Sequence, residues 1–272
     1  MSRINKIAEK AALANRKLLI PYLVAGDPNL ETTSALMHKL VGQGADIIEL
    51  GIPFSDPSSD GPIIQRGVER ALAKGTTVKQ VLGLVAEFRK TDTDTGIVLM
   101  GYLNPIEIMG YKAFAEAASA AGVDGVLTVD LPPMEADELN AMMRAVKVDT
   151  IFLVAPTTRE ERVASIIEHC SGYLYYVSLK GVTGAALTDF GSVTANINKL
   201  RERTQLPIVI GFGIKDAQSA AAMGKLADGV IIGSALVEKI ALLADQVEHE
   251  SALLSDTIRV ISEAREALDK LV

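Results

Sequence analysis

Short apolar segments rich in β-branched residues recur along this chain, and most are followed by a polar loop and then by a stretch with helical periodicity. This alternation constrains the fold more than any other feature, because strands joined through helices pair in parallel. The spacing predicts α/β architecture with eight strands, at residues 18–25, 45–52, 96–103, 125–131, 150–155, 173–179, 207–212 and 228–233. Eight such units match a single closed (β/α)8 TIM barrel.

Amphipathic segments separate these strands, and three further helices are expected outside the minimal repeat. The intervening helices are predicted at residues 31–42, 77–89, 111–121, 135–146, 159–169, 192–203 and 217–226, and the additional ones at 3–15, 63–73 and 256–271. No linker or change in composition divides the chain, so residues 1–272 are interpreted as one domain. A doubly wound open sheet is the alternative. It is disfavoured because no Gly-x-Gly-x-x-Gly follows the first strand and most strands read as buried on both faces.

The charge and cysteine content restrict the possible partners. Lys and Arg number 27 against 34 Asp and Glu, a net charge of −7, which argues against nucleic acid as a partner. The single cysteine, Cys170, excludes internal disulfides, and the histidines show no metal-ligand spacing. No apolar run is long enough to span a membrane and no signal peptide is visible, so a soluble, cytoplasmic protein without a metal is expected.

One strand ends in an ionisable residue. Glu49 closes the apolar segment 45–50, and strand alternation puts Ile47, Glu49 and Gly51 on one face. A carboxylate in such a position is costly to desolvate unless it has a task or a partner, which makes Glu49 a catalytic candidate. The Gly-, Pro- and Ser-rich loop that follows adds Asp56 and Asp60. From spacing alone, each of these is equally readable as a turn or helix-cap residue.

Glycines at the ends of the seventh and eighth strands predict a phosphate site. Gly211-Phe212-Gly213-Ile214 and Gly233-Ser234-Ala235 would place backbone N–H groups near an anion, and Gly184 from the loop after the sixth strand would join them. The alternative is that these glycines only permit tight turns. Tyr22, Tyr102 and Tyr175 are expected to point into the barrel, either to line a site or simply to fill the interior.

These motifs together resemble the α subunit of tryptophan synthase over essentially the whole chain. The most specific is Glu-Leu-Gly-Ile-Pro-Phe-Ser-Asp-Pro at residues 49–57, followed by Asp-Gly-Pro-Ile-Ile-Gln at 60–65. Further matches are Gly26-Asp27-Pro28, Met100-Gly101-Tyr102-Leu103-Asn104-Pro105, Asp130-Leu131-Pro132, Ala155-Pro156-Thr157-Thr158, Gly181-Val182-Thr183-Gly184, Gly211-Phe212-Gly213-Ile214 and Gly233-Ser234-Ala235.

The resemblance implies cleavage of indole-3-glycerol phosphate to indole and glyceraldehyde 3-phosphate. It also implies an α2β2 complex in which indole passes to a β subunit that carries pyridoxal phosphate, with no cofactor in this chain. Glu49 would then act as acid and base, Asp60 would accept the indole N–H, and Tyr175 would orient the substrate or Glu49. The indole slot would be lined by Tyr22, Met100, Tyr102, Leu127, Leu153 and Phe212; the phosphate would be held by Gly184, Gly213, Gly233 and Ser234, with Thr183 in a loop over the site.

One departure from the family pattern bears on Asp60. Ser58-Ser59 stands where the family usually has a larger apolar residue and then Ala, and the two hydroxyls could hydrogen-bond the Asp60 carboxylate. The expected consequence is a looser loop or weaker activation by the partner. Two other functions therefore stay open: another phosphate-binding barrel isomerase or epimerase, and a mainly regulatory subunit with weakened lyase activity.

Overall fold

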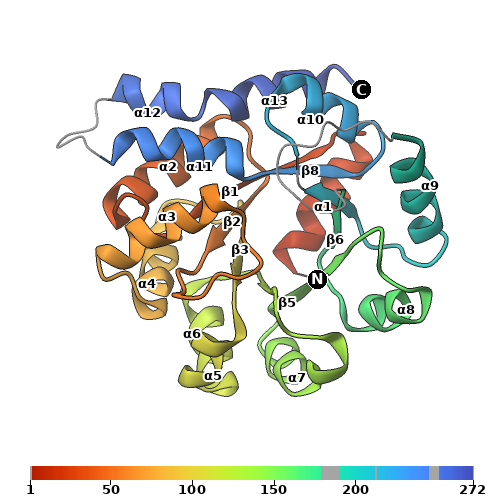
Figure 1. Cartoon of the computed structure of the whole chain (residues 1–272), viewed down its shortest axis with the longest axis horizontal. Helices are drawn as coiled ribbons and strands as arrows, with labels where there is room; N and C mark the ends of the chain where they lie inside the picture. Colours follow the sequence, from red (N-terminus) through yellow and green to blue (C-terminus); the bar gives the residue numbers. More distant parts are fainter. Residues whose placement is uncertain (1, 179–189, 212, 245–250, 272) are drawn as a thin grey trace.

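The computed structural model describes residues 2–178, 190–211, 213–244 and 251–271. In these residues, eight parallel strands form a closed barrel in which each strand pairs with the next and β8 returns to β1 (Figure 1). The strands are β1 (Leu18–Val24), β2 (Ile47–Gly51), β3 (Gly96–Gly101), β4 (Gly125–Thr128), β5 (Asp149–Val154), β6 (Leu174–Val177), β7 (Ile208–Gly211) and β8 (Gly229–Ile232). The predicted TIM barrel is confirmed, and the open doubly wound sheet is excluded.

Helices surround the barrel in Figure 1. They are α1 (Arg3–Leu13), α2 (Leu30–Gly42), α3 (Pro62–Ala73), α4 (Val78–Phe88), α5 (Leu103–Met109), α6 (Tyr111–Ala121), α7 (Asp137–Ala145), α8 (Glu160–His169), α9 (Phe190–Arg201), α10 (Ala217–Gly224), α11 (Ser234–Ile240), α12 (Ser251–Thr257) and α13 (Arg259–Asp269), with 3₁₀ turns at Pro133–Glu135 and Ala241–Leu243. In the described residues, no helix has the length and apolar character needed to cross a membrane.

Several predicted boundaries differ from the structure; the fourth strand, for example, ends at Thr128 and not at 131. The third strand ends at Gly101 and not at 103, because α5 begins at Leu103, whose N–H donates to Asp130 Oδ1 at 2.8 Å. Pro105 lies in the first turn of α5, where proline is tolerated. The helix expected over 256–271 begins only at Arg259, as α13, because Ile258 leaves helical geometry; the separate helix α12 ends at Thr257.

The strands separate two apolar layers. Alternate residues of each strand point into the barrel, as Ile47 does, or outward against the helices, as Ile48 and Leu50 do. Ile4 of α1 belongs to the inner layer and lies against Gly125 at the start of β4. Helix α1 therefore packs against the amino-terminal end of the barrel, opposite the end where active sites of this fold are found.

A repeated polar contact ties the amino-terminal ends of the strands together in pairs. In each pair, one residue lies just before an even-numbered strand. Its side-chain oxygen accepts the main-chain N–H of a residue in the odd-numbered strand before it. The main-chain N–H of the same residue donates to the carbonyl of that strand residue. The four pairs are Asp46 with Leu19, Asp124 with Ile97, Ser171 with Thr150 and Asp228 with Ile208, with N to side-chain oxygen distances of 2.9, 2.8, 2.9 and 2.9 Å.

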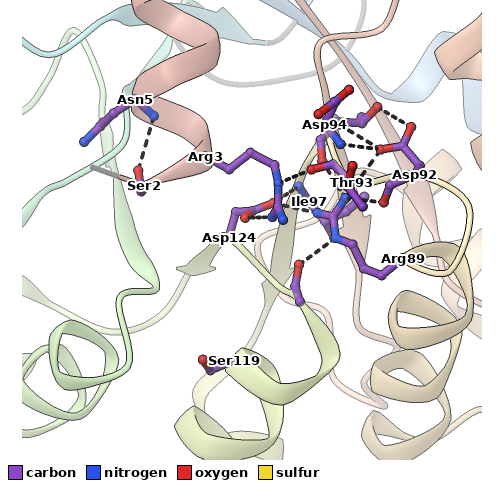
Figure 2. A network of polar contacts seen from close by, with 12 residues as sticks. Ser2, Arg3, Asn5, Arg89, Asp92, Thr93, Asp94, Ile97, Ser119 and Asp124 are labelled. Atoms are coloured by element: carbon purple, nitrogen blue, oxygen red, sulfur yellow. Dashed lines mark hydrogen bonds and ion pairs between the residues drawn. The ribbon is translucent and has the colours of Figure 1, made fainter.

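Arginines neutralise the three carboxylates of these pairs. Asp124 is the best surrounded: Arg89 Nη2 lies 2.7 Å from Oδ2, and Arg3 of α1 binds Oδ1 (Figure 2). Arg16 pairs with Asp46 in the same way, and Arg201 pairs with Asp228 at 2.8 Å. This end of the barrel is thus fixed by charge-assisted hydrogen bonds.

Candidate active site at the carboxyl ends of the strands

Glu49 points into the barrel from β2 and is completely buried. The Tyr173 hydroxyl donates to its Oε1, whereas Oε2 has no hydrogen-bond partner among the described residues. Burial raises the pKa of Glu49 from 4.5 to about 7, and the Tyr173 hydrogen bond opposes that rise. Glu49 is therefore poised to exist in both protonation states near neutral pH, as a group that gives and takes protons requires.

Asp60 lies in the loop between β2 and α3, just before the helix begins. The Tyr102 hydroxyl donates to Asp60 Oδ2 at 3.0 Å, and the Ser59 N–H donates to the same hydroxyl oxygen at 3.0 Å. Phe54 from the loop packs on the Tyr102 ring, with ring centroids 5.3 Å apart. Burial raises the pKa of Asp60, while the bond from Tyr102 lowers it.

Two tyrosines, Tyr22 and Tyr175, lie close to the carboxylates. Each packs against a glycine of the next strand, Gly51 and Gly211 respectively. A Cβ on Gly51 would lie 2.4 Å from the hydroxyl of Tyr22, and a Cβ on Gly211 would lie 2.1 Å from that of Tyr175. Burial, followed by the charges of Glu49 and Asp60, raises the pKa of both tyrosines well above 10. They therefore stay protonated, and both lie close to both carboxylates.

These groups line one pocket at the carboxyl ends of the strands. Its cavity is small, about 70 Å³, which is less than the volume of a typical small-molecule site. Glycine 213, with φ of +75°, and the β8–α11 junction form part of the wall, so main-chain groups face the space there. The lining residues are Tyr22, Glu49, Asp60, Gly61, Ile64, Met100, Tyr175, Gly213, Ile214, Ile231, Gly233 and Ser234.

Most of the predicted site residues meet in this pocket, and the others lie elsewhere. Tyr102 does not line the pocket but is hydrogen-bonded to Asp60, which does. Leu127 is fully buried in the inner layer of the barrel and does not line the pocket, and Leu153 lines a separate cavity beside Leu131 and Met134. Phe212, Gly184 and Thr183 lie outside the described residues.

The contact of Glu49 differs from the sequence interpretation. Tyr175 is predicted to orient the substrate or Glu49; the hydroxyl that binds Glu49 belongs to Tyr173, two residues earlier on the same inward face of the chain. The alternation of Tyr173 and Tyr175 is visible in the sequence, but which of them reaches across the barrel depends on the stagger of β6 relative to β2. Ile64 and Ile231 also line the pocket, which the sequence does not predict, because apolar residues at such positions are equally typical of the core.

Ser58 and Ser59 do not contact Asp60 as the sequence suggested. In the described part of the chain, neither serine hydroxyl is hydrogen-bonded to the Asp60 carboxylate, and both residues are exposed. Only the main-chain N–H of Ser59 enters the network, through Tyr102. The described residues also contain no group of three or more His, Cys, Asp or Glu arranged to hold a metal ion.

Comparison with known proteins identifies a family for the chain. A family model described as tryptophan synthase alpha chain matches residues 8–266. The chain belongs to the tryptophan synthase alpha chain family. Among its relatives, the tryptophan synthase alpha chain of Marinobacter nauticus is 55% identical over 271 residues, covering 100% of this chain and 99% of that protein. That of Thioalkalivibrio sulfidiphilus is 52% identical over 269 residues, covering 99% of this chain and 100% of that protein.

Solved structures of the same family have the same fold. The tryptophan synthase subunit alpha of Legionella pneumophila str. Paris superposes with a TM-score of 0.91 at 44% identity and covers 99% of both chains. Tryptophan synthase from M. tuberculosis in an aminoacrylate-bound form gives 0.86 at 33% identity, covering 98% of this chain and 100% of that one. As a tryptophan synthase alpha chain family member, the protein is an enzyme of the alpha reaction, a lyase of tryptophan biosynthesis.

Proposed function

We propose that the pocket between Glu49 and Asp60 cleaves indole-3-glycerol phosphate to indole and glyceraldehyde 3-phosphate. One observation carries this proposal: a buried glutamate with one unpartnered carboxylate oxygen lines the same pocket as an aspartate and the glycines that end β7 and β8. The first two groups suit proton transfer and stabilisation of positive charge. The glycines suit the phosphate tail of the same molecule.

Glu49 serves both proton transfers of the retro-aldol step. It gives a proton to indole C3, which makes the ring a cation, and the hydroxyl on the adjacent side-chain carbon loses its proton. The carbon–carbon bond then breaks, its electrons return to the ring, and the hydroxyl carbon becomes the aldehyde. One proton is given and one is taken, so Glu49 returns to its starting state. A pKa of about 7 suits a group that works in both directions.

Asp60 accepts the hydrogen bond of the indole N–H. Its negative charge matters most when positive charge develops on the protonated ring, so it stabilises the transition state more than the bound substrate. Tyr22, Met100, Ile64 and Ile231 form the apolar slot for the ring, and Leu127 and Leu153 do not line it. Gly213, Gly233 and Ser234 hold the phosphate; Gly184, Thr183 and Phe212, which the family resemblance also assigns to the site, lie outside the described residues.

A partner receives the indole. The family implies a beta subunit, and we extend this to an α2β2 heterotetramer whose β subunits carry pyridoxal phosphate, while this chain needs no cofactor and works in the cytoplasm. Two large apolar side chains support a docking surface at the mouth of the barrel. Ile108, in helix α5 after β3, is 81% exposed, and Met134, in the 3₁₀ turn after β4, is 82% exposed.

The test is indole release by the full chain from indole-3-glycerol phosphate, with simple sugar phosphates as comparison substrates. Asp60→Asn should lose about 10²–10³ in kcat, and Glu49→Gln at least as much. Asp56→Asn is the matched control, because Asp56 is an exposed carboxylate of the same loop whose contact is with the Ser55 hydroxyl. Wild-type turnover by either site variant, or equal use of sugar phosphates, would contradict the proposal.

A further inference from the structure

A side chain from α3 fixes the main chain of the turn that carries Asp60. Gln65 Nε2 lies 2.9 Å from the carbonyl oxygen of Asp60 and 3.3 Å from that of Pro57. The Pro57 carbonyl also accepts the Asp60 N–H at 3.0 Å, which closes the turn 57–60. One amide group therefore binds both ends of this turn.

We infer that Gln65 is a positioning residue for Asp60, holding the turn 57–60 where the carboxylate meets both Tyr102 and the pocket. This inference rests on the catalytic role proposed for Asp60. Gln65 itself does not line the pocket, so it acts through the turn and not on the substrate.

The chemistry of the contact explains why a glutamine is required. Two carbonyl acceptors need two N–H donors, and a terminal amide carries two on one nitrogen. Glutamate at the same length would present acceptor oxygens to both carbonyls, and methionine would present no donor. Either replacement leaves the Asp60 carbonyl and the Pro57 carbonyl without this partner.

Helix α3 is held against the barrel by an ion pair, so a side chain from it can fix the position of a loop. Arg70, further along α3, binds both carboxylate oxygens of Asp27 at 2.7 and 2.8 Å, and the Asp27 side chain is completely buried after β1. Gly67 allows this approach, because a Cβ there would lie 2.9 Å from Asp27 Oδ2. Gln65 thus connects the Asp60 turn to a helix that is locked onto the barrel by a bidentate ion pair.

The turn also controls the only described hydrogen bond to the Asp60 carboxylate. The Tyr102 oxygen binds two members of the turn at once, the Ser59 N–H and Asp60 Oδ2. A shift of the turn therefore breaks both bonds together. A displacement of about 1 Å is enough to cost about 10²-fold in rate when it misplaces a catalytic group.

The first test measures the turn and needs no catalysis. Gln65→Met and Gln65→Glu should raise hydrogen–deuterium exchange at the Ser59 and Asp60 amides by roughly tenfold or more, since both amides are bonded only within this network. Gln80→Met is the matched control: Gln80 is also a glutamine in the first turn of a helix, where it forms the capping box of α4. Its loss should leave the exchange at residues 59 and 60 unchanged.

The second test is a double-mutant cycle on kcat. Gln65→Met should lower kcat by about tenfold or more with little change in KM, and should have no further effect in the Asp60→Asn background. Unchanged exchange at residues 59 and 60, unchanged kcat, or an equal fall in both backgrounds would each overturn the inference. A wild-type chain that releases no indole would instead overturn the proposed function, while the exchange result would still report on the turn.

Discussion

The Tyr173 hydroxyl donates to one carboxylate oxygen of Glu49 and leaves the other without a partner in the described part of the chain. The bond joins the residue just before β6 to β2 across the interior of the barrel, so it fixes the carboxyl plane from the opposite wall. It also favours the ionised form of a group whose burial favours the neutral one. The unpartnered oxygen is the one available for proton transfer.

Replacing Tyr173 by phenylalanine should shift the pH dependence of the lyase reaction. The change removes the hydrogen bond that stabilises the Glu49 carboxylate, so the pKa of Glu49 rises further above about 7. The inflection of kcat/KM assigned to Glu49 should move to higher pH. Tyr175→Phe is the control, because no hydrogen bond joins Tyr175 to Glu49 in the described residues; an equal shift in both variants would disprove the assignment to Tyr173.

Glu49→Gln should stabilise the fold at alkaline pH. The folded-state pKa is raised from 4.5 to about 7, so the native state holds the proton more tightly and the free energy of unfolding falls as pH increases through this window. Relative to pH 4, the free energy of unfolding of the wild-type protein is lower by about 3 kcal/mol once the pH is well above 7. Urea unfolding at pH 8 should therefore show the variant more stable by up to that amount, and the advantage should vanish near pH 4. A constant difference across this range would contradict burial of the charged form.

Gly211→Ala should reduce catalysis by displacing Tyr175. The new methyl would lie 2.1 Å from the Tyr175 hydroxyl, a distance at which one of the two groups must move. We expect kcat/KM to fall by roughly tenfold or more, with the change visible in a crystal structure of the variant. Gly83→Ala on α4 is the control, because a Cβ there meets nothing within 4 Å, and it should leave the rate unchanged.

Asp124→Ala should reduce stability without changing the chemistry. It removes the carboxylate that binds Arg3, Arg89 and the Ile97 N–H (Figure 2). This network lies at the amino-terminal end of the barrel, whereas the pocket lies at the carboxyl ends of the strands. Loss of one member of a buried ion pair costs about 3–5 kcal/mol. Urea unfolding should show that loss, with kcat retained where the variant is folded. Asp94→Ala, an exposed carboxylate nearby, should change the unfolding free energy by less than about 0.5 kcal/mol.

The period-two pattern around Glu49 predicts that it shares one face of its strand with Ile47 and Gly51, and the closure of the barrel decides that this face points inward. The eight strands followed from the same kind of signal. The partners of the carboxylates could not be predicted: Tyr173 meets Glu49, and Tyr102 meets Asp60, only through the closure and stagger of the barrel. Gln65 was visible as part of a family motif, but its contact with the main chain of the Asp60 turn depends on how the loop folds back over α3.

Each reciprocal contact at the amino-terminal end of the barrel joins an odd-numbered strand to the even-numbered strand after it, as Asp46 joins Leu19 and Asp228 joins Ile208. None of the four crosses from an even-numbered strand to the following odd one. The chain is therefore divided into four two-strand modules, and the connections between modules are the seams. A circular permutant opened at a seam keeps each of these contacts inside an unbroken module. A permutant opened between Leu19 and Asp46 must instead form that contact from two separate ends of the chain.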